Sequence, residues 1–136
     1  MTLSPKKGKR SRNYARGAST ERFLRDDLYA RGASIVMRGA GSKSVIPKEV
    51  AEKKWDQNPP KVDLLAVVPF WPTSVLFIQS KPRAGSIPKK QREALERLGN
   101  EVNACVAEGF RNKGAKYDII HCSHSKEWAN QCAFLA

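Results

Sequence analysis

Four polar side chains have types and positions that could support chemistry. Asp63 begins the apolar run "VDLLAVV", and Gln79 and Lys81 end the next run, "VLFIQSK". Glu21 opens a stretch with helical spacing. In a strand, Gln79 and Lys81 share one face because side chains alternate, whereas Ser80 between them points the other way. An acid inside a buried run is costly unless it is paired or metal-bound, so we expect Asp63 to have a function.

The two apolar runs are joined by "PFWPT", which suits a turn. If the runs pair as an antiparallel hairpin, Asp63 at the start of one strand lies beside Gln79 and Lys81 at the end of the other. Mg²⁺ takes carboxylate and carbonyl oxygens, lowers the pKa of bound water and neutralises charge developing on phosphate. A lysine nearby can orient that water or stabilise the transition state. The set therefore suits hydrolysis of a phosphodiester.

The patterns around these residues predict one α/β domain, a central mixed sheet flanked by helices. We expect a helix from Glu21 to Arg31 and a longer one from Pro88 to about Gly109. In the longer helix Gln91, Leu95, Leu98, Val102 and Cys105 mark one face. Strands are expected at 33–38, 62–68, 74–80 and 116–123. The two central runs are continuously apolar, so the sheet should be covered on both faces.

The ends and one internal segment differ from this pattern. Residues 1–17 are basic and almost without aliphatic side chains, which predicts a flexible arm followed by a single domain over 18–136. Residues 43–60 carry several Lys and Glu and end in "DQNPP". We interpret that segment as an insertion, either a loop or a short amphipathic helix.

Basic residues outnumber acidic ones in this chain of 136 residues. Lysine and arginine number 25 against 13 acids, so the net charge is +12. This balance favours polyanions, chiefly nucleic acid, with a membrane surface as the rival. No window of about 18 apolar residues that could span a bilayer is present. Cys105, Cys122 and Cys132 have wide spacings, which argues against a disulfide framework or a zinc site and fits a cytoplasmic setting.

Five segments occur in an order that resembles a known family. "GASTERFLRDDLYARG", "RGAGS", "VDLLAV", "FIQSK" and "IPKKQREAL" are similar to the archaeal-type Holliday junction resolvases of the PD-(D/E)XK nuclease superfamily. That family has a Glu in its first helix, a Ser-containing loop, an Asp on one strand and E-x-K on the next. A helix that often carries Gln follows. The resemblance covers roughly residues 16–100 and implies a restriction-endonuclease-like fold.

The resemblance also implies an activity. It implies a structure-selective DNA endonuclease that resolves four-way junctions as a homodimer, with Mg²⁺ or Mn²⁺ as cofactor. By position, Glu21, Asp63 and Gln79 would ligate the metal, Lys81 would be catalytic and Ser42 would lie near the scissile phosphate. Basic residues would contact DNA: Arg16, Arg22, Arg38, Lys43, Arg83, Lys89 and Lys90.

Two positions depart from the family pattern. Val62 replaces the proline expected before the acid, a change without chemical consequence. Gln79 replaces a carboxylate and offers a carbonyl oxygen without charge, so the metal should bind less tightly. Two alternatives therefore stay open: a non-catalytic nucleic-acid-binding module on the same fold, and a related nuclease with another DNA substrate. The segment 43–60 looks longer than the family's loop, so the loop serine is either Ser42 or Ser44.

These residues also have purely structural explanations. Glu21 could be a first-turn acid stabilised by the helix dipole, and Lys81 a strand-end cation that reaches solvent. Ser42 could be a turn former. We expect Gln91 to be a solvated residue of the second helix.

Overall fold

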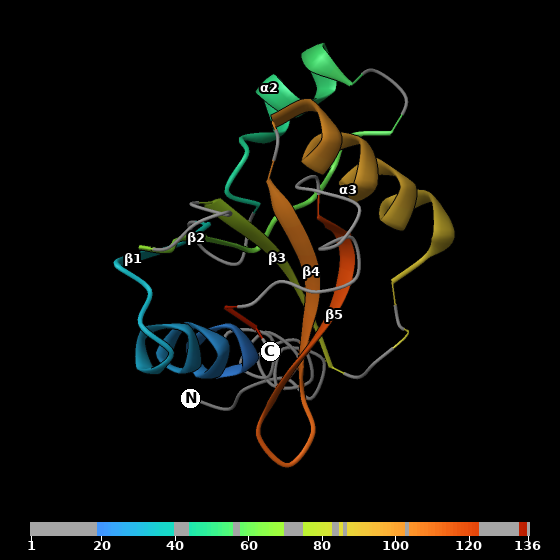
Figure 1. Cartoon of the computed structure of the whole chain (residues 1–136). Coiled ribbons are helices and arrows are strands. Elements are labelled where there is room, and N and C mark those ends of the chain that lie inside the picture. Colours follow the sequence, from blue (N-terminus) through green and yellow to red (C-terminus); the bar gives the residue numbers. More distant parts are fainter. Residues whose placement is uncertain are drawn as a thin grey trace, which may run out of the picture.

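The computed structural model describes residues 19–39, 44–55, 58–69, 75–82, 85, 87–102, 104–122 and 134–135. Figure 1 shows a twisted sheet with helices on both of its faces. The sheet has five strands in the order β1-β2-β3-β4-β5. This arrangement confirms the predicted α/β fold with a central mixed sheet. Within the described residues, each helix is too short or too polar to pass through a membrane.

The helices and strands follow the predicted order, with one additional strand. The first helix covers residues 19–30 and is drawn blue in Figure 1. The other elements are β1 (Ile35–Arg38), α2 (Lys48–Lys54), β2 (Leu64–Val67), β3 (Val75–Lys81), α3 (Lys89–Val102), β4 (Cys105–Arg111) and β5 (Ala115–Cys122). The predicted segment 43–60 thus contains the short helix α2. The predicted arm, residues 1–17, lies outside the described residues.

The strand pairing brings the two apolar runs together. β2 pairs antiparallel with β3, with Leu64 opposite Ile78, as the hairpin prediction requires. β1 adds antiparallel to β2, and β5 adds antiparallel to β4. β3 and β4 are parallel, and α3 lies between them in the chain. Parallel neighbours need such a crossover, because a tight turn can join only antiparallel strands.

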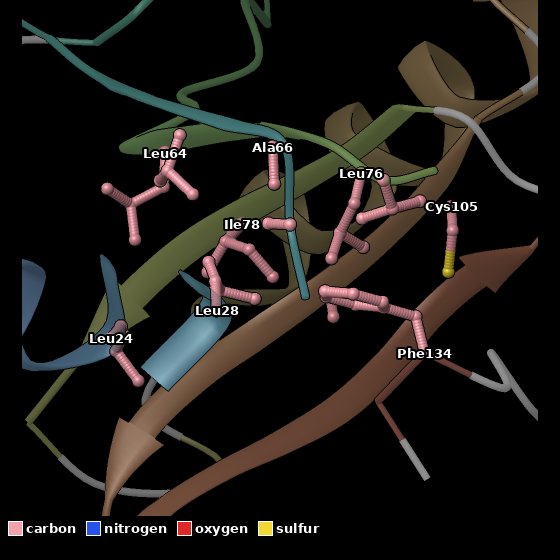
Figure 2. Packing of buried hydrophobic residues seen from close by; sticks show 12 residues of the cluster. Leu24, Leu28, Leu64, Ala66, Leu76, Ile78, Cys105 and Phe134 are labelled. Atoms are coloured by element: carbon pink, nitrogen blue, oxygen red, sulfur yellow. The ribbon is translucent and has the colours of Figure 1, made fainter. Parts of the chain in front are cut away.

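Two hydrophobic clusters cover the two faces of the sheet. The first helix packs Leu24 and Leu28 against one face, and Figure 2 shows them gathered with Leu64 and Ile78. α3 packs Leu95 and Leu98 against the other face, around Phe77 and Val106. The full first cluster is Leu24, Leu28, Ala33, Val36, Leu64, Ala66, Val68, Leu76, Ile78, Cys105, Ala107 and Phe134. The prediction of a sheet covered on both faces is confirmed.

The prediction for the second helix was wrong at its end. α3 ends at Val102 instead of continuing to about Gly109, and residues 105–111 form β4. Cys105 therefore belongs to a strand and not to the apolar face of a helix. Every residue from Cys105 to Phe110 is buried, because β4 lies between β3 and β5 under both helical layers. A strand buried on both faces shows no alternation, and this run continued the helical spacing by coincidence.

Gly109 allows the first helix to lie close to the sheet. A Cβ atom at this position would lie 2.9 Å from Leu24 Cδ1 and 2.9 Å from Ile78 Cγ2. Both neighbouring side chains are fully buried, so they have little room to retreat. The missing side chain thus sets how closely the helix that carries Glu21 approaches β3 and β4.

Gly109→Ala should therefore destabilise the protein by about 1–3 kcal/mol, the usual cost of overpacking a core. The added methyl group would push Leu24 outward and displace the first helix. Urea unfolding followed by circular dichroism measures the change. A midpoint equal to that of the wild type would show that the helix can shift at no cost.

Candidate functional site

Asp63 connects the start of β2 with the end of β3. Its main-chain N–H donates to the carbonyl oxygen of Ile78 at 2.9 Å. Its carboxylate Oδ2 accepts hydrogen bonds from the Ser80 N–H at 2.8 Å and from the Ser80 hydroxyl at 3.3 Å. Ser80 lies between Gln79 and Lys81 along the strand, so Asp63 meets the polar end of β3 as the hairpin argument predicts.

Glu21 brings a second buried carboxylate to the same place. It lies in the first helix, is only 3% exposed, and its Oε2 is 3.3 Å from Arg38 Nη2 on β1. Burial raises the pKa of the Glu21 carboxyl above its ordinary value; the hydrogen bond from Arg38 opposes this, and the nearby charge of Asp63 adds to it. Two acids from distant parts of the chain thus influence each other electrostatically.

The Asp63 carboxylate is also poorly hydrated. It is 4% exposed, and burial raises its pKa above the ordinary value. The hydrogen bonds from Ser80 and the positive charges of Lys61 and Lys81 lower the pKa and offset part of this effect. Lys61 acts on Glu21 in the same direction. Two lysines and Arg38 therefore surround a pair of buried acids that lack their full hydration.

Gln79 is buried with one of its two amide atoms unsatisfied. It is 1% exposed, and its Nε2 donates to Gln91 Oε1 on α3 at 3.0 Å. Its Oε1 is buried and has no hydrogen-bond partner among the described residues. Our expectation that Gln91 is a solvated helix residue was wrong, because Gln91 is half-buried and orients the Gln79 amide. The unsatisfied carbonyl oxygen is the kind of neutral donor that a hard cation accepts.

Glu21, Asp63 and Gln79 carry the oxygen types that a divalent cation such as Mg²⁺ or Mn²⁺ takes. Glu21 and Asp63 supply two buried carboxylates, and Gln79 supplies a buried carbonyl oxygen without a partner in the described part of the chain. Within the described residues, no three His, Cys, Asp or Glu side chains gather closely enough to hold a metal ion. Metal binding at this site would therefore depend on the amide oxygen or on a further ligand.

The remaining predicted residues have different positions. Lys81 ends β3, is half-buried and acts electrostatically on Asp63. Arg38 is paired with Glu21, Arg22 is exposed on the first helix, and Lys89 and Lys90 are exposed at the start of α3. Four of the predicted residues lie outside the described part of the chain: Arg16, Ser42, Lys43 and Arg83. The predicted roles of these residues stay predictions.

Ser44, the alternative loop serine, has a clear structural role. Its Oγ accepts hydrogen bonds from the main-chain N–H groups of Ile46, at 3.2 Å, and Val62, at 3.0 Å. These bonds tie the loop to the residue that precedes Asp63. A cavity of about 760 Å³ opens here, and its lining includes Arg38, Ser44, Lys48 and Lys61. The side of the site next to Arg38 and Lys61 is therefore hollow and basic.

Sequence reasoning missed two charged residues near the site. Lys61 precedes Val62 and Asp63 directly, but an exposed lysine in a loop carries no pattern that marks it. Glu108 lies in β4 and is fully buried. It stands inside the apolar run "CVAEGF", the same signal that identified Asp63, and the mistaken helix assignment hid it.

Comparisons with models of known protein families and with curated proteins find no match for this chain. The resemblance to junction resolvases therefore stays a prediction from the order of the motifs in the sequence.

Asp63→Asn should make the protein more stable at neutral pH, by about 0.5–2 kcal/mol, because it removes a poorly hydrated buried charge. Burial raises the folded-state pKa, so the folded protein holds this proton to a higher pH than the unfolded chain does. The wild type should lose stability as pH rises from the ordinary value of 3.8 through the raised pKa. The variant should lack the part of this loss that comes from Asp63 and keep the part that comes from Glu21, whose pKa is also raised. Urea unfolding over that range, without divalent cations, measures the difference.

Asp26→Asn is the matched control, because it removes the same charge from a side chain that is 69% exposed. It should not stabilise the protein. A stability difference between Asp63→Asn and the wild type that stays constant from acid to neutral pH would contradict the explanation by burial.

Proposed function

We propose that this protein is a metal-dependent DNA endonuclease that resolves four-way junctions by paired phosphodiester hydrolysis. One observation carries the proposal. The buried Asp63 carboxylate accepts a hydrogen bond from Ser80 at the polar end of β3. Its charge raises the pKa of Glu21, and the charges of Lys61 and Lys81 lower its own pKa. Buried acids next to cations at one end of a sheet are typical of functional sites, where pKa values are often shifted. The net charge of +12 suits a polyanionic substrate.

The residues would divide the work as follows. Glu21 and Asp63 would hold a divalent cation, with Gln79 Oε1 as a neutral donor. The bound cation would lower the pKa of a water molecule and neutralise charge developing on the phosphate. Lys81 would orient that water or stabilise the transition state. Arg38 and Lys61, on the wall of the adjacent cavity, would contact phosphates of the incoming strand.

The order of the motifs favours a four-way junction over other DNA substrates, because that order resembles the junction resolvases. A junction has pairs of equivalent strands, and paired nicks require two active sites. A homodimer with two-fold symmetry supplies them most simply. The junction would be recognised by its shape and phosphates, since phosphate contacts carry no direct base information.

Cleavage of a labelled synthetic four-way junction in Mg²⁺ or Mn²⁺ tests the proposal. We expect symmetric nicks, and a loss of cleavage rate of at least about 100-fold in Asp63→Ala, because that variant lacks a charged metal ligand. Asp26→Ala, at an exposed position of the first helix, is the control and should cleave normally. Equal cleavage by Asp63→Ala and the wild type would overturn the assignment of the site. Equal cutting of a linear duplex would indicate a nuclease with another substrate.

A second candidate is a non-catalytic module that binds nucleic acid through the same fold. It is favoured by Gln79, which brings no charge, and by Arg38, which already neutralises Glu21. Tight junction binding without nicks in either metal would support this candidate.

The N-terminal segment offers a separate test of DNA binding. Residues 1–17 contain six Lys and Arg and no acid. Deleting them should weaken binding to the junction and flatten its salt dependence, by about 0.9 in the log–log slope for each phosphate that the segment neutralises. Fluorescence anisotropy at several salt concentrations measures the slope. An unchanged slope would show that these residues do not contact DNA.

A further inference from the structure

Glu108 is a fully buried carboxylate without a hydrogen bond from any described residue. It lies in the middle of β4 and is 0% exposed. Both Oε1 and Oε2 are buried and have no hydrogen-bond partner in the described part of the chain. Its ion-pair partner is Arg92 on α3, whose Nη1 is 3.9 Å from Oε2 and whose own side chain is 41% exposed. Such a long pair with a partly exposed arginine compensates little of the cost of burying a carboxylate.

Glu108 lies beside Gln79. The two residues are partners in the parallel register of β3 and β4, so their side chains leave the same face of the sheet from backbones about 5 Å apart. This is the face covered by α3, because Gln79 bonds Gln91 and Glu108 approaches Arg92 on that helix. On its other side, Glu108 pairs with Asp118 of β5. A second acid directly opposite makes an uncompensated charge on Glu108 more costly.

Two neighbouring residues on one face of the sheet therefore carry three buried oxygen atoms that accept no hydrogen bond from the described residues. They are Oε1 of Gln79 and both carboxylate oxygens of Glu108. The Gln79 Nε2 group donates one of its two hydrogens to Gln91, and among the described residues no hydrogen bond reaches either Glu108 oxygen. Oxygen acceptors that lack donors can be satisfied by a cation, and carboxylate and amide oxygens are the ligands of hard divalent ions.

We infer that Glu108 and Gln79 bind a divalent cation together, and that Glu108 supplies the negative charge that Gln79 lacks. The carboxylate missing from the end of β3 is thus provided by the neighbouring strand. This inference rests on the proposed function, because Gln79 is a metal ligand in both; in the described residues Glu108 does not form one cluster of acids with Glu21 and Asp63. Metal binding can nevertheless be measured without DNA or cleavage.

Isothermal titration of the full chain with Mn²⁺ tests the inference. Glu108→Gln keeps the shape of the side chain and removes its charge, so it should weaken Mn²⁺ binding by at least about tenfold. Glu96→Gln removes the same charge from an exposed position of α3 and should bind Mn²⁺ like the wild type. Mn²⁺ affinity that is equal in Glu108→Gln and the wild type would overturn the inference, as would a wild type that binds no Mn²⁺.

A measurement on the unmodified protein covers the case in which Glu108→Gln does not fold. At 15.2 kDa the chain suits side-chain NMR. The ¹³Cδ resonances of Glu108 and Gln79 should shift on addition of Mg²⁺ and saturate at the same concentration. A Glu108 resonance that does not move would overturn the inference. That result would indicate that the Gln79 amide is rotated and that its Nε2 donates to Glu108.

The outcomes separate this inference from the nuclease proposal. A protein that binds Mn²⁺ through Glu108 but does not cut DNA would overturn the proposed activity and support the cation site. A protein that cuts junctions, and whose Glu108→Gln variant binds Mn²⁺ normally, would support the proposed activity and overturn the cation site at Glu108.

Discussion

The carboxylate of Asp63 is held against the main chain of β3 by the N–H and hydroxyl of Ser80. This contact brings an acid out of water at the place where the first helix, β2 and β3 come together. The acid is tolerated there because Lys61 and Lys81 compensate part of the charge. Glu21 is buried near it, and the positive charge of Arg38 compensates part of the Glu21 charge in the same way. The raised pKa values of both acids follow from this arrangement.

Hydrophobic packing in the rest of the domain offsets the destabilisation that comes from burying these acids. Two hydrophobic clusters, one on each face of the sheet, hold the first helix and α3 in fixed positions. Gly109 lets the helix that carries Glu21 approach closely. Natural proteins commonly give up stability at functional sites, where charges are buried for chemistry and not for folding. Glu108 is a further buried acid, which lies in the sheet without a hydrogen bond from the described residues.

The apolar runs predicted the first helix, β1, the β2–β3 hairpin and β5, because each run has a period and a clear boundary. Asp63 was predictable because an acid stood where only apolar residues were expected. β4 could not be predicted, because the apolar residues of a strand buried on both faces can continue the spacing of a preceding helix. Glu108, which lies in β4, was missed for the same reason. The bond between Gln79 and Gln91 could not be foreseen either, because it depends on how α3 is seated on the sheet.

Glu21 and Asp63 are far apart in the chain, and only the packing of the first helix on the completed sheet brings them together. The helix contributes Glu21, and the β2–β3 hairpin contributes Asp63 and Gln79. Assembly of the site therefore requires long-range contacts between the first helix and the sheet. A divalent ion bound by residues from both parts would therefore stabilise the folded protein and fasten the helix to the hairpin.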